Sequence, residues 1–433
     1  MSGEGCNAGV QDEAEAHFRR GDVLRDLRRW EEALDSYGRA AARRPLDADA
    51  VCNVGNVLRE LGRWPEALAA YDRAITIRPD NAMVHANRGV VLKELQRFDE
   101  AVASLDRAVE LQPDYASAHF NRGIVSLLLG RLESGWADYE WRWEDAKGAV
   151  YRERRPFRQP RWRGQAVAGK TVLLYGEQGY GDVLQFCRYT RLLAERGAEV
   201  NLEARAPLVS LLADLEGVSR LVTLGGTLPS FDYHCPLMSL PLAFGTRLGT
   251  IPQSTPYLRS DAGKVEFWQA LLGPKRGPRV GLAWSGNPAH ISDRSRSIEL
   301  SRLLRGLPKG YQYISLQKDV RETDRPALVS AELVDASKEL HDFSDTAALC
   351  DCLDVVISVD TSVAHLSAAL GRPTWVLLSA LPDWRWMLGR TDSPWYGSVT
   401  LYRQDEPDAW EGVLMRVAAD LGRACVPGQV SPR

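Results

Sequence analysis

A 34-residue repeat fills the first third of the chain and constrains its fold more than any other feature of the sequence. Six columns of residues recur at this spacing, each over three or four periods, which chance does not readily produce. A fixed period of this length is the signature of stacked supersecondary units. The recurring positions are Gly21, Gly55, Gly89 and Gly123; Trp30, Trp64, Phe98 and Leu132; Ala33, Ala67 and Ala101; Tyr37, Tyr71 and Leu105; Ala40, Ala74 and Ala108; Pro45, Pro79 and Pro113.

Each period carries the residues that two packed antiparallel helices need. The glycine and alanine columns let the helices approach closely, the aromatic and leucine columns fill the space between pairs, and the proline column ends the second helix. The pattern resembles the tetratricopeptide repeat (TPR) over residues 12–145. The first and last periods are atypical, as terminal repeats are. Their departures are Arg19 in place of an asparagine, and Gly135, Trp136, Trp141 and Trp143.

A column of asparagines, Asn53, Asn87 and Asn121, lies two positions before the glycines. On the first helix of such a repeat this column faces the concave groove, where side-chain amides can hydrogen-bond an extended peptide backbone without reading its sequence. The column resembles the asparagine ladder in the repeat arm of O-linked N-acetylglucosamine transferase. The alternative is that each asparagine caps or bonds locally within its own repeat.

Composition excludes several classes of protein. The formal net charge is -3, so the strongly basic footprint of a nucleic-acid-binding protein is absent. No apolar stretch approaches the roughly 18 residues that a membrane span needs, and the N-terminal sequence lacks the pattern of a secretory signal. The cysteines are odd in number and scattered, which predicts reduced thiols and a cytoplasmic protein. They are Cys6, Cys52, Cys187, Cys235, Cys350, Cys352 and Cys425.

Residues 146–165 are predicted to form a linker strap, because the stretch is basic, contains prolines and has no apolar period. A solvated linker is the favoured use, and contact with an acidic ligand is the alternative. From Lys170 the pattern changes to alternating buried strands and amphipathic helices. We expect two Rossmann-like α/β domains, at 166–275 and 276–433, that face each other across a cleft. Ligands of such sheets bind beyond the carboxyl ends of the strands.

One strand-to-helix junction has the chemistry of an anion site. The segment Asp360-Thr-Ser-Val-Ala-His365 follows the apolar strand 354–359. Asp360 or Thr361 is expected to cap the helix, which leaves amide N–H groups directed outward at the positive end of the helix dipole. Such an arrangement binds phosphate. His365, one turn after Thr361, is placed to donate to a phosphoryl oxygen; the alternative is a buried histidine bonded to backbone.

The surrounding sequence, Ser358 to Pro373, resembles the nucleotide-sugar site of the heptosyltransferase-like glycosyltransferases. In that family the residues matching Asp360, Thr361, Ser362 and His365 contact the diphosphate and sugar of the donor. Ser362 departs from the family pattern, in which many members have glycine, and its side chain narrows the approach to phosphate. The resemblance implies a GT-B fold of two facing Rossmann-like domains.

The glycine-rich loop Gly179-Tyr-Gly181-Asp182 resembles the loop of the same family whose aspartate is the proposed general base. An acceptor hydroxyl that attacks an anomeric carbon needs a nearby carboxylate to take its proton, and Asp182 is the candidate. Gly179 and Gly181 are expected to line the donor site. The alternative is that Asp182 only caps the following helix.

A third loop supplies cations. Asn287, His290, Arg294 and Arg296 are predicted to contact the donor, with the charged groups neutralising a departing diphosphate; for both arginines a solvated loop surface is the alternative. Downstream, residues 382–386 and 393–396 are dense in aromatic side chains that either stack on a base or sugar, or form a core lid.

The catalytic half contains no Asp-x-Asp motif and no cluster of histidines and carboxylates, so we expect no metal and no cofactor beyond the nucleotide-sugar co-substrate. The sequence therefore predicts an α + α/β protein, a TPR helical solenoid followed by a GT-B transferase with an inverting mechanism. The TPR arm implies a protein or peptide acceptor, such as flagellin or another surface protein. Alternatives are a lipopolysaccharide or polysaccharide precursor as acceptor, or a non-catalytic TPR scaffold with a degenerate transferase fold.

Overall fold

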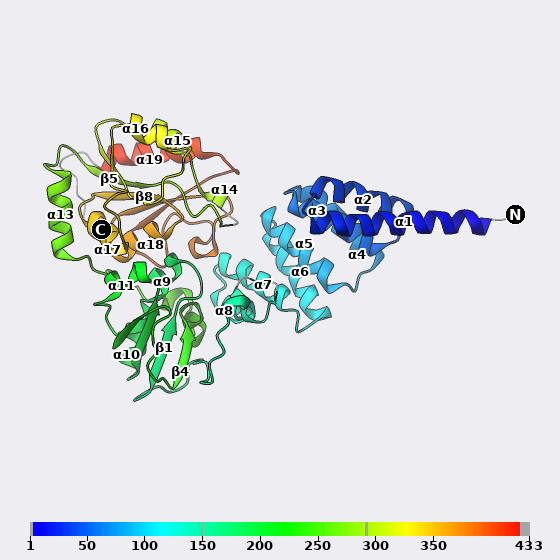
Figure 1. The fold of residues 1–433 in the computed structure, drawn as a ribbon, viewed down its shortest axis with the longest axis horizontal. Coiled ribbons are helices and arrows are strands. Elements are labelled where there is room, and N and C mark those ends of the chain that lie inside the picture. The colour runs from blue at the N-terminus through cyan, green and yellow to red at the C-terminus, as the bar shows by residue number, and fades with distance from the viewer. Residues whose placement is uncertain (1–2, 147, 149, 254, 291–292, 425–433) are drawn as a thin grey trace. The chain divides into compact units, whose positions relative to one another are not determined.

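The computed structural model describes residues 3–146, 148, 150–253, 255–290 and 293–424, and it divides into two compact units, Met1–Arg152 and Glu153–Arg433 (Figure 1). The first unit is helical and the second contains two parallel β-sheets. The prediction of a helical-repeat solenoid followed by an α/β region is confirmed at this level. None of the helices in the described residues combines the length and the hydrophobicity that a membrane span requires.

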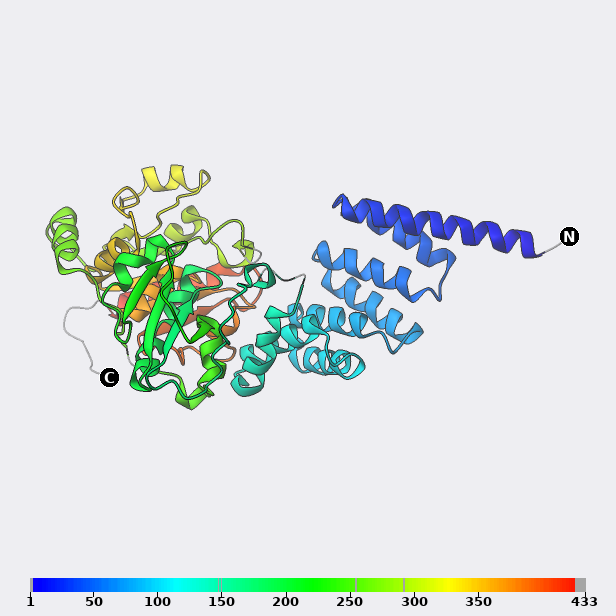
Figure 2. The ribbon, with the colours of Figure 1, turned by 60° about the horizontal axis from the view of Figure 1, so that its bottom comes forward.

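The first unit consists of antiparallel helix pairs stacked in sequence order, as Figure 2 shows. Two short 3-10 helices, η1 (Glu140–Trp143) and η2 (Val150–Glu153), follow the last pair. The pairs are α1 (Gly3–Asp26) with α2 (Trp30–Arg43), α3 (Ala48–Glu60) with α4 (Trp64–Ile77), α5 (Ala82–Glu94) with α6 (Phe98–Leu111), and α7 (Ala116–Leu128) with α8 (Leu132–Tyr139).

The glycine column is explained by the contact between the helices of a pair. A Cβ atom on Gly21 would lie 2.6 Å from the ring of Tyr37, and one on Gly55 would lie 2.8 Å from the ring of Tyr71. These distances are shorter than any ordinary carbon–carbon contact, so only glycine lets the aromatic side chain of the second helix reach the backbone of the first. The three alanines at positions 33, 67 and 101 are completely buried. The 34-residue period therefore specifies the packing of each pair.

The first sheet of the second unit has four parallel strands in the order β3-β2-β1-β4. Its strands are β1 (Thr171–Tyr175), β2 (Glu199–Ala204), β3 (Arg220–Thr223) and β4 (Tyr233–Pro236). The helices of this part are α9 (Tyr180–Phe186), α10 (Tyr189–Glu195), α11 (Ala206–Leu212) and α12 (Leu240–Ala243), with the 3-10 turns η3 (Leu237–Ser239) and η4 (Leu248–Thr250). The next helix, α13 (Ala262–Leu272), packs against helix α17 (Phe343–Asp351) of the second sheet.

The basic strap joins this sheet. Arg161 forms a parallel bridge to His234 at the β4 edge, and the Trp162 side chain is fully buried. Arg155 forms an ion pair with the buried carboxylate of Glu203 and lies over the ring of Phe157 at 4.7 Å. The expectation of a solvated linker is wrong for this part of the strap, because its aromatic and cationic side chains find partners in the sheet.

The second sheet has six parallel strands in the order β10-β9-β8-β5-β6-β7, and its central strands β5 and β8 are buried along their whole length. Its strands are β5 (Arg279–Ala283), β6 (Gln312–Ser315), β7 (Leu333–Asp335), β8 (Val355–Val359), β9 (Thr374–Leu378) and β10 (Val399–Arg403). Its helices are α14 (Asp293–Arg296), α15 (Leu300–Gly306), α16 (Arg325–Ser330), α17 (Phe343–Asp351), α18 (Ser362–Ala369) and α19 (Trp410–Ala424), with the 3-10 turn η5 (Trp384–Trp386).

Candidate functional site

Two helices that follow central strands meet at one place in the α/β unit. Helix α9 follows β1 and helix α18 follows β8, and the two pack against each other (Figure 1). A Cβ atom on Gly181 would lie 2.9 Å from Cδ2 of His365, so the glycine permits this approach. The glycine-rich loop and the predicted phosphate-binding helix start, which belong to different sheets, are thus neighbours.

Asp182 is held by two interactions. Its Oδ2 accepts a hydrogen bond from the backbone N–H of Gly179 at 2.7 Å. Gly179 is the N-cap of α9 and Asp182 lies in the first turn, so Asp182 bonds back to the cap residue and is not itself the cap that the sequence offered as the alternative role. Its Oδ1 pairs with the Arg385 guanidinium. The side chain is 16% exposed. Both oxygens of the carboxylate therefore have a donor, because the second oxygen binds Arg385.

Arg385 comes from η5 in the segment that follows β9, and its side chain is 8% exposed. Its Nη1 donates to Oδ1 of Asp383 at 2.7 Å, so one guanidinium joins two carboxylates. Burial raises the pKa of Asp383, but Arg385 outweighs burial and the pKa is lowered overall. The sequence placed this arginine only within an aromatic-rich stretch, although an arginine flanked by Trp384 and Trp386 is a signal that it is buried.

The start of α18 leaves backbone donors unused. Thr361 occupies the N-cap position, but its side chain makes no capping bond, and its hydroxyl lies 3.1 Å from that of Ser358. Among the described residues, the N–H groups of Ser362 and Val363 have no acceptor. The positive end of the helix dipole lies at the same point. These two amides are therefore available to an anion.

Arg296 brings a cation to this helix start. Its Nη1 donates to the backbone carbonyl of Asp360 at 2.9 Å, and its guanidinium covers Gly286, where a Cβ atom would lie 2.5 Å from Nη2. Ser285 follows β5, which runs beside β8, and its buried hydroxyl has no hydrogen-bond partner in the described part of the chain. Burial, with Asp383 nearby, raises the pKa of Asp360 above its usual range.

His365 lies inside the protein. It is 4% exposed, its ring stacks on Trp386 at 5.1 Å between centroids, and its Nδ1 lies 2.9 Å from the hydroxyl of Tyr396. Burial and then the Arg385 charge lower the pKa of His365 to about 3, so the imidazole is neutral. If Tyr396 donates to Nδ1, the proton sits on Nε2, on the side of the ring that faces Gly181. The alternative that His365 bonds to backbone is replaced by a bond to Tyr396.

The third loop contributes unequally. Arg296 joins the site, while Asn287 and Arg294 are exposed, and Oδ1 of Asn287 accepts from the N–H of Ala289 at 2.9 Å. His290 as a whole residue is also exposed. Partial burial of its imidazole and then the positive charge of Arg296 lower its pKa. The sequence offered a solvated loop surface as the alternative for both arginines. Arg294 is solvated in this way, and Arg296 is not.

The aromatic segments form core rather than an open lid. Trp384, Trp386, Trp395 and Tyr396 are buried. The buried side chain of Arg188 lies among them, with the guanidinium carbon 4.6 Å from the Tyr396 ring centroid and Nη2 donating to Tyr257 at 2.9 Å. These contacts join segments that follow the two sheets. The aromatic side chains therefore pack as core, which is one of the two uses expected from the sequence.

The asparagine column of the TPR unit is partly engaged by the chain's own residues. Asn87 donates through Nδ2 to Asn56 at 2.9 Å, and its Oδ1 accepts from Arg59 at 3.1 Å. Asn53 accepts from Asn56 at 3.2 Å, and Nδ2 of Asn121 donates to the carbonyl of Ser117 at 2.8 Å. Within the described residues, Nδ2 of Asn53 and Oδ1 of Asn121 have no partner. Local bonding therefore uses part of the column's capacity, and the rest is available.

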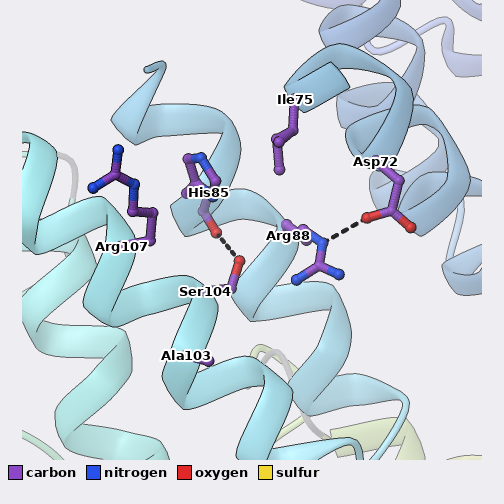
Figure 3. A pocket seen from close by; sticks show the side chains of 7 residues that line it. All are labelled: Asp72, Ile75, His85, Arg88, Ala103, Ser104 and Arg107. Atoms are coloured by element: carbon purple, nitrogen blue, oxygen red, sulfur yellow. Dashed lines mark hydrogen bonds and ion pairs between the residues drawn. The ribbon is translucent and has the colours of Figure 1, made fainter. Parts of the chain in front are cut away.

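A separate hollow of about 300 Å³ lies where α4, α5 and α6 meet (Figure 3). Its cations are already paired or exposed: Arg88 bonds to Asp72 at 2.6 Å, and Arg107 bonds to Glu110 at 3.0 Å. The hydroxyl of Ser104 donates to the carbonyl of His85 at 2.9 Å. The charged side chains that line this hollow are not directed at one shared point, whereas those around Asp182 are. In the part of the chain that the structure describes, no group of three or more His, Cys, Asp or Glu residues could hold a metal ion.

Comparison with known proteins identifies the first unit. Residues 14–47 match the model of the tetratricopeptide repeat, and residues 55–96 and 91–130 match a second TPR model. The chain is similar to protein FlbA of Caulobacter vibrioides, with 28% identity over 327 residues, which cover 68% of this chain and 53% of FlbA. The chain thus spans about half the length of that curated relative.

Solved structures resemble the repeat region. MamA matches with 18% identity and a TM-score of 0.30, covering 32% of this chain and 76% of MamA. YrrB, described as a TPR protein with an unusual peptide-binding site, matches with 24% identity and a TM-score of 0.28, covering 31% of this chain and 70% of YrrB. The matches to the two TPR models, and not these structures, show that the first unit carries TPR repeats, which imply a protein-interaction scaffold.

Proposed function

We propose that the α/β unit is a nucleotide-sugar-dependent glycosyltransferase of the GT-B kind. The single observation that carries the proposal is the meeting of Gly181 and Asp182, at the end of one parallel sheet, with the unused amides of α18 at the end of another. An anion site built of helix amides and Arg296 lies beside a carboxylate, which is the pair of groups that glycosyl transfer from a diphosphate donor needs.

The chemistry follows from these groups. The oxygen of the acceptor hydroxyl attacks the anomeric carbon, its proton passes to Asp182, and the bond between that carbon and the diphosphate oxygen breaks. The electron pair leaves with the nucleoside diphosphate, whose growing charge the amides of Ser362 and Val363 and the guanidinium of Arg296 stabilise. Attack from the face opposite the leaving group inverts the anomeric configuration. No metal ligand set among the described residues takes part in this scheme.

A protein is the acceptor that we favour. The TPR unit is a protein-interaction scaffold, and the free amide atoms of Asn53 and Asn121 can bond to a peptide backbone. A transferase that carries such an arm has a means of recruiting a polypeptide to its site.

Ligand-induced thermal stabilisation tests the proposal. The full chain is melted with a panel of UDP-, GDP-, ADP-, CDP- and dTDP-sugars, because a ligand that binds the native state raises the melting temperature. One donor class should stabilise the wild type, and Arg296→Gln should lose most of that stabilisation. Arg294→Gln, an exposed arginine of the same loop, is the matched control and should keep it. If no nucleotide sugar shifts the wild type, the glycosyltransferase proposal fails.

A non-catalytic scaffold is the second candidate, and one observation favours it. Both oxygens of Asp182 are engaged, one by Gly179 and one by Arg385, and His365 is buried against Trp386. A degenerate transferase fold would retain such packing without binding a donor. The donor panel separates the two candidates, since the scaffold predicts no shift with any nucleotide sugar.

A further inference from the structure

We infer that Arg385 is a positioning residue that exchanges Asp182 for the donor's diphosphate, so that donor binding releases the general base. This inference rests on the proposed function. It concerns an arginine that lies 203 residues from Asp182 in the sequence and makes a direct ion pair with it.

The structure shows why Asp182 is a poor proton acceptor while this ion pair lasts. Oδ2 is occupied by the N–H of Gly179 at 2.7 Å and Oδ1 by the guanidinium, in a pocket where the carboxylate is 16% exposed. A carboxylate can accept about four hydrogen bonds, so an incoming hydroxyl group has to compete with these two donors for lone pairs of a side chain that is 16% exposed. The Gly179 bond also caps α9, so the Arg385 bond is the one whose loss leaves the local fold intact.

Arg385 is held so that it can change partner without leaving the site. Its Nη1 remains fixed to Asp383 at 2.7 Å, and its guanidinium carbon lies over the Trp384 ring at 4.2 Å from the centroid. The ion pair that it makes with Asp182 lies beside the start of α18, because a Cβ atom on the neighbouring Gly181 would lie 3.7 Å from Cα of Ser362. A diphosphate on the α18 amides therefore comes within reach of the same guanidinium that binds Asp182.

The guanidinium of Arg385 pairs with two carboxylates, Asp182 and Asp383, so it can release Asp182 and still keep Asp383 as a partner. A phosphate oxygen is a strong acceptor for a guanidinium, with the same fork geometry as a carboxylate. Transfer of Nη2 to the donor leaves Asp182 with one capping bond and a free oxygen. The base is thus active only when the donor is present.

A double-mutant cycle on diphosphate binding tests this coupling. Inorganic pyrophosphate, which has the diphosphate charge without base or sugar, is titrated calorimetrically into the full-length wild type, Asp182→Asn, Arg385→Gln and the double variant. Asp182→Asn keeps an acceptor for the Gly179 cap and should raise affinity about threefold, because Arg385 no longer has to leave a carboxylate. Arg385→Gln should lower affinity about tenfold. In the double variant the gain from Asp182→Asn should vanish.

The remaining outcomes are decisive in the other direction. If Asp182→Asn raises pyrophosphate affinity equally with and without Arg385, Asp182 acts on the anion only through its charge. If Asp182→Asn does not raise the affinity at all, Arg385 does not exchange partners. Either result overturns the inference while the proposed function stands. If the wild type binds neither pyrophosphate nor any nucleotide sugar, the proposed function fails and the inference with it. Arg390→Gln, which removes the exposed Arg390–Asp392 pair from the same segment, is the control and should change affinity less than about twofold.

Arg385→Lys guards against a folding artefact. Lysine keeps the positive charge near Asp182 but lacks the planar fork that joins two acceptors. Its thermal melt should match the wild type more closely than that of Arg385→Gln, while its pyrophosphate affinity should stay below that of the wild type. Wild-type affinity in Arg385→Lys would show that only charge matters, which contradicts the exchange.

Discussion

Gly181 in helix α9 lies against the imidazole of His365 in helix α18, and a Cβ atom on the glycine would lie 2.9 Å from Cδ2 of the ring. This contact joins the ends of two parallel sheets. Because His365 is itself fixed by Trp386 and Tyr396, the ring cannot move aside without disturbing buried neighbours.

Gly181→Ala should therefore destabilise the protein by about 1–3 kcal/mol through overpacking. Chemical denaturation followed by tryptophan fluorescence measures the change. Gly179→Ala is the matched control in the same loop, since a Cβ atom on Gly179 would lie 3.4 Å from Oδ2 of Asp182, an ordinary contact. Equal stability of Gly181→Ala and the wild type would show that the two helices are not packed as described.

His365 should make the protein sensitive to acid. Its pKa is lowered from 6.5 to about 3, chiefly by burial and then by Arg385, with Asp383 opposing. Below pH 6.5 the unfolded chain takes up a proton that the folded chain refuses, so stability falls as the pH is lowered, by about 2 kcal/mol at pH 5. His365→Gln should lose less stability than the wild type between pH 7 and pH 5. If the wild type and His365→Gln lose the same stability between pH 7 and pH 5, the imidazole is protonated in the folded state.

Comparing how the free energy of unfolding changes with pH in the wild type and in His365→Gln separates the effect of His365 from that of other titrating groups. Burial also lowers the pKa of His234 to about 4, and it acts in the same sense. The raised pKa of Asp360 acts in the opposite sense, because the folded chain then holds a proton that the unfolded chain releases. Both contributions are present in the wild type and in His365→Gln and cancel in the comparison.

Gln185 on α9 gives a prediction about buried polarity. The side chain is completely buried, and neither amide atom has a hydrogen-bond partner in the described part of the chain. A buried amide without partners costs about 1–3 kcal/mol. Gln185→Met, which keeps the length of the side chain, should raise the free energy of unfolding by about 1 kcal/mol, and Gln185→Glu should lower it. Denaturant titration measures both, and a clear loss of stability in Gln185→Met contradicts the prediction.

The asparagines of the TPR unit should contribute unequally to peptide binding. Asn53 and Asn121 each keep an amide atom without a partner among the described residues, whereas both ends of the Asn87 amide are bonded. With a peptide selected from a random library on the immobilised full chain, Asn53→Ala and Asn121→Ala should each weaken binding by about three- to tenfold, and Asn87→Ala by less.

Fluorescence anisotropy of the labelled peptide measures these affinities. Gln112→Ala, an exposed amide outside the column, is the control and should leave binding unchanged. A larger loss for Asn87 than for its neighbours would show that the column works through its internal bonds instead of its free atoms.

The TPR unit could be predicted well from the sequence, because the contacts that define each repeat join residues that are close in the chain and recur at a fixed period. The contact of Gly21 with Tyr37 repeats as Gly55 with Tyr71, so one period specifies the next. The α/β strands were also predictable, since β1 and β8 are short, mostly apolar runs of the kind that buried parallel strands have. These features depend on residues that are close in the chain.

The partners of the site residues could not be predicted in the same way. Asp182 and Arg385 are far apart in sequence, and neither spacing nor composition indicates that they pair. The burial of His365 depends on Trp386 and Tyr396, which come from later loops. The strap around Arg155 was expected to be solvated, because its basic composition does not reveal Glu203 inside the sheet. Tertiary pairing decides each of these cases.

In the proposed function, the start of α18 holds a nucleoside diphosphate opposite the loop of Gly181. A crystal structure of the full chain grown with the nucleotide that gives the largest thermal shift tests it most directly. We expect phosphate oxygens about 2.7–3.2 Å from the amide nitrogens of Ser362 and Val363, with Arg296 in contact. Density for the nucleotide at another place, or none at saturating concentration, would contradict it.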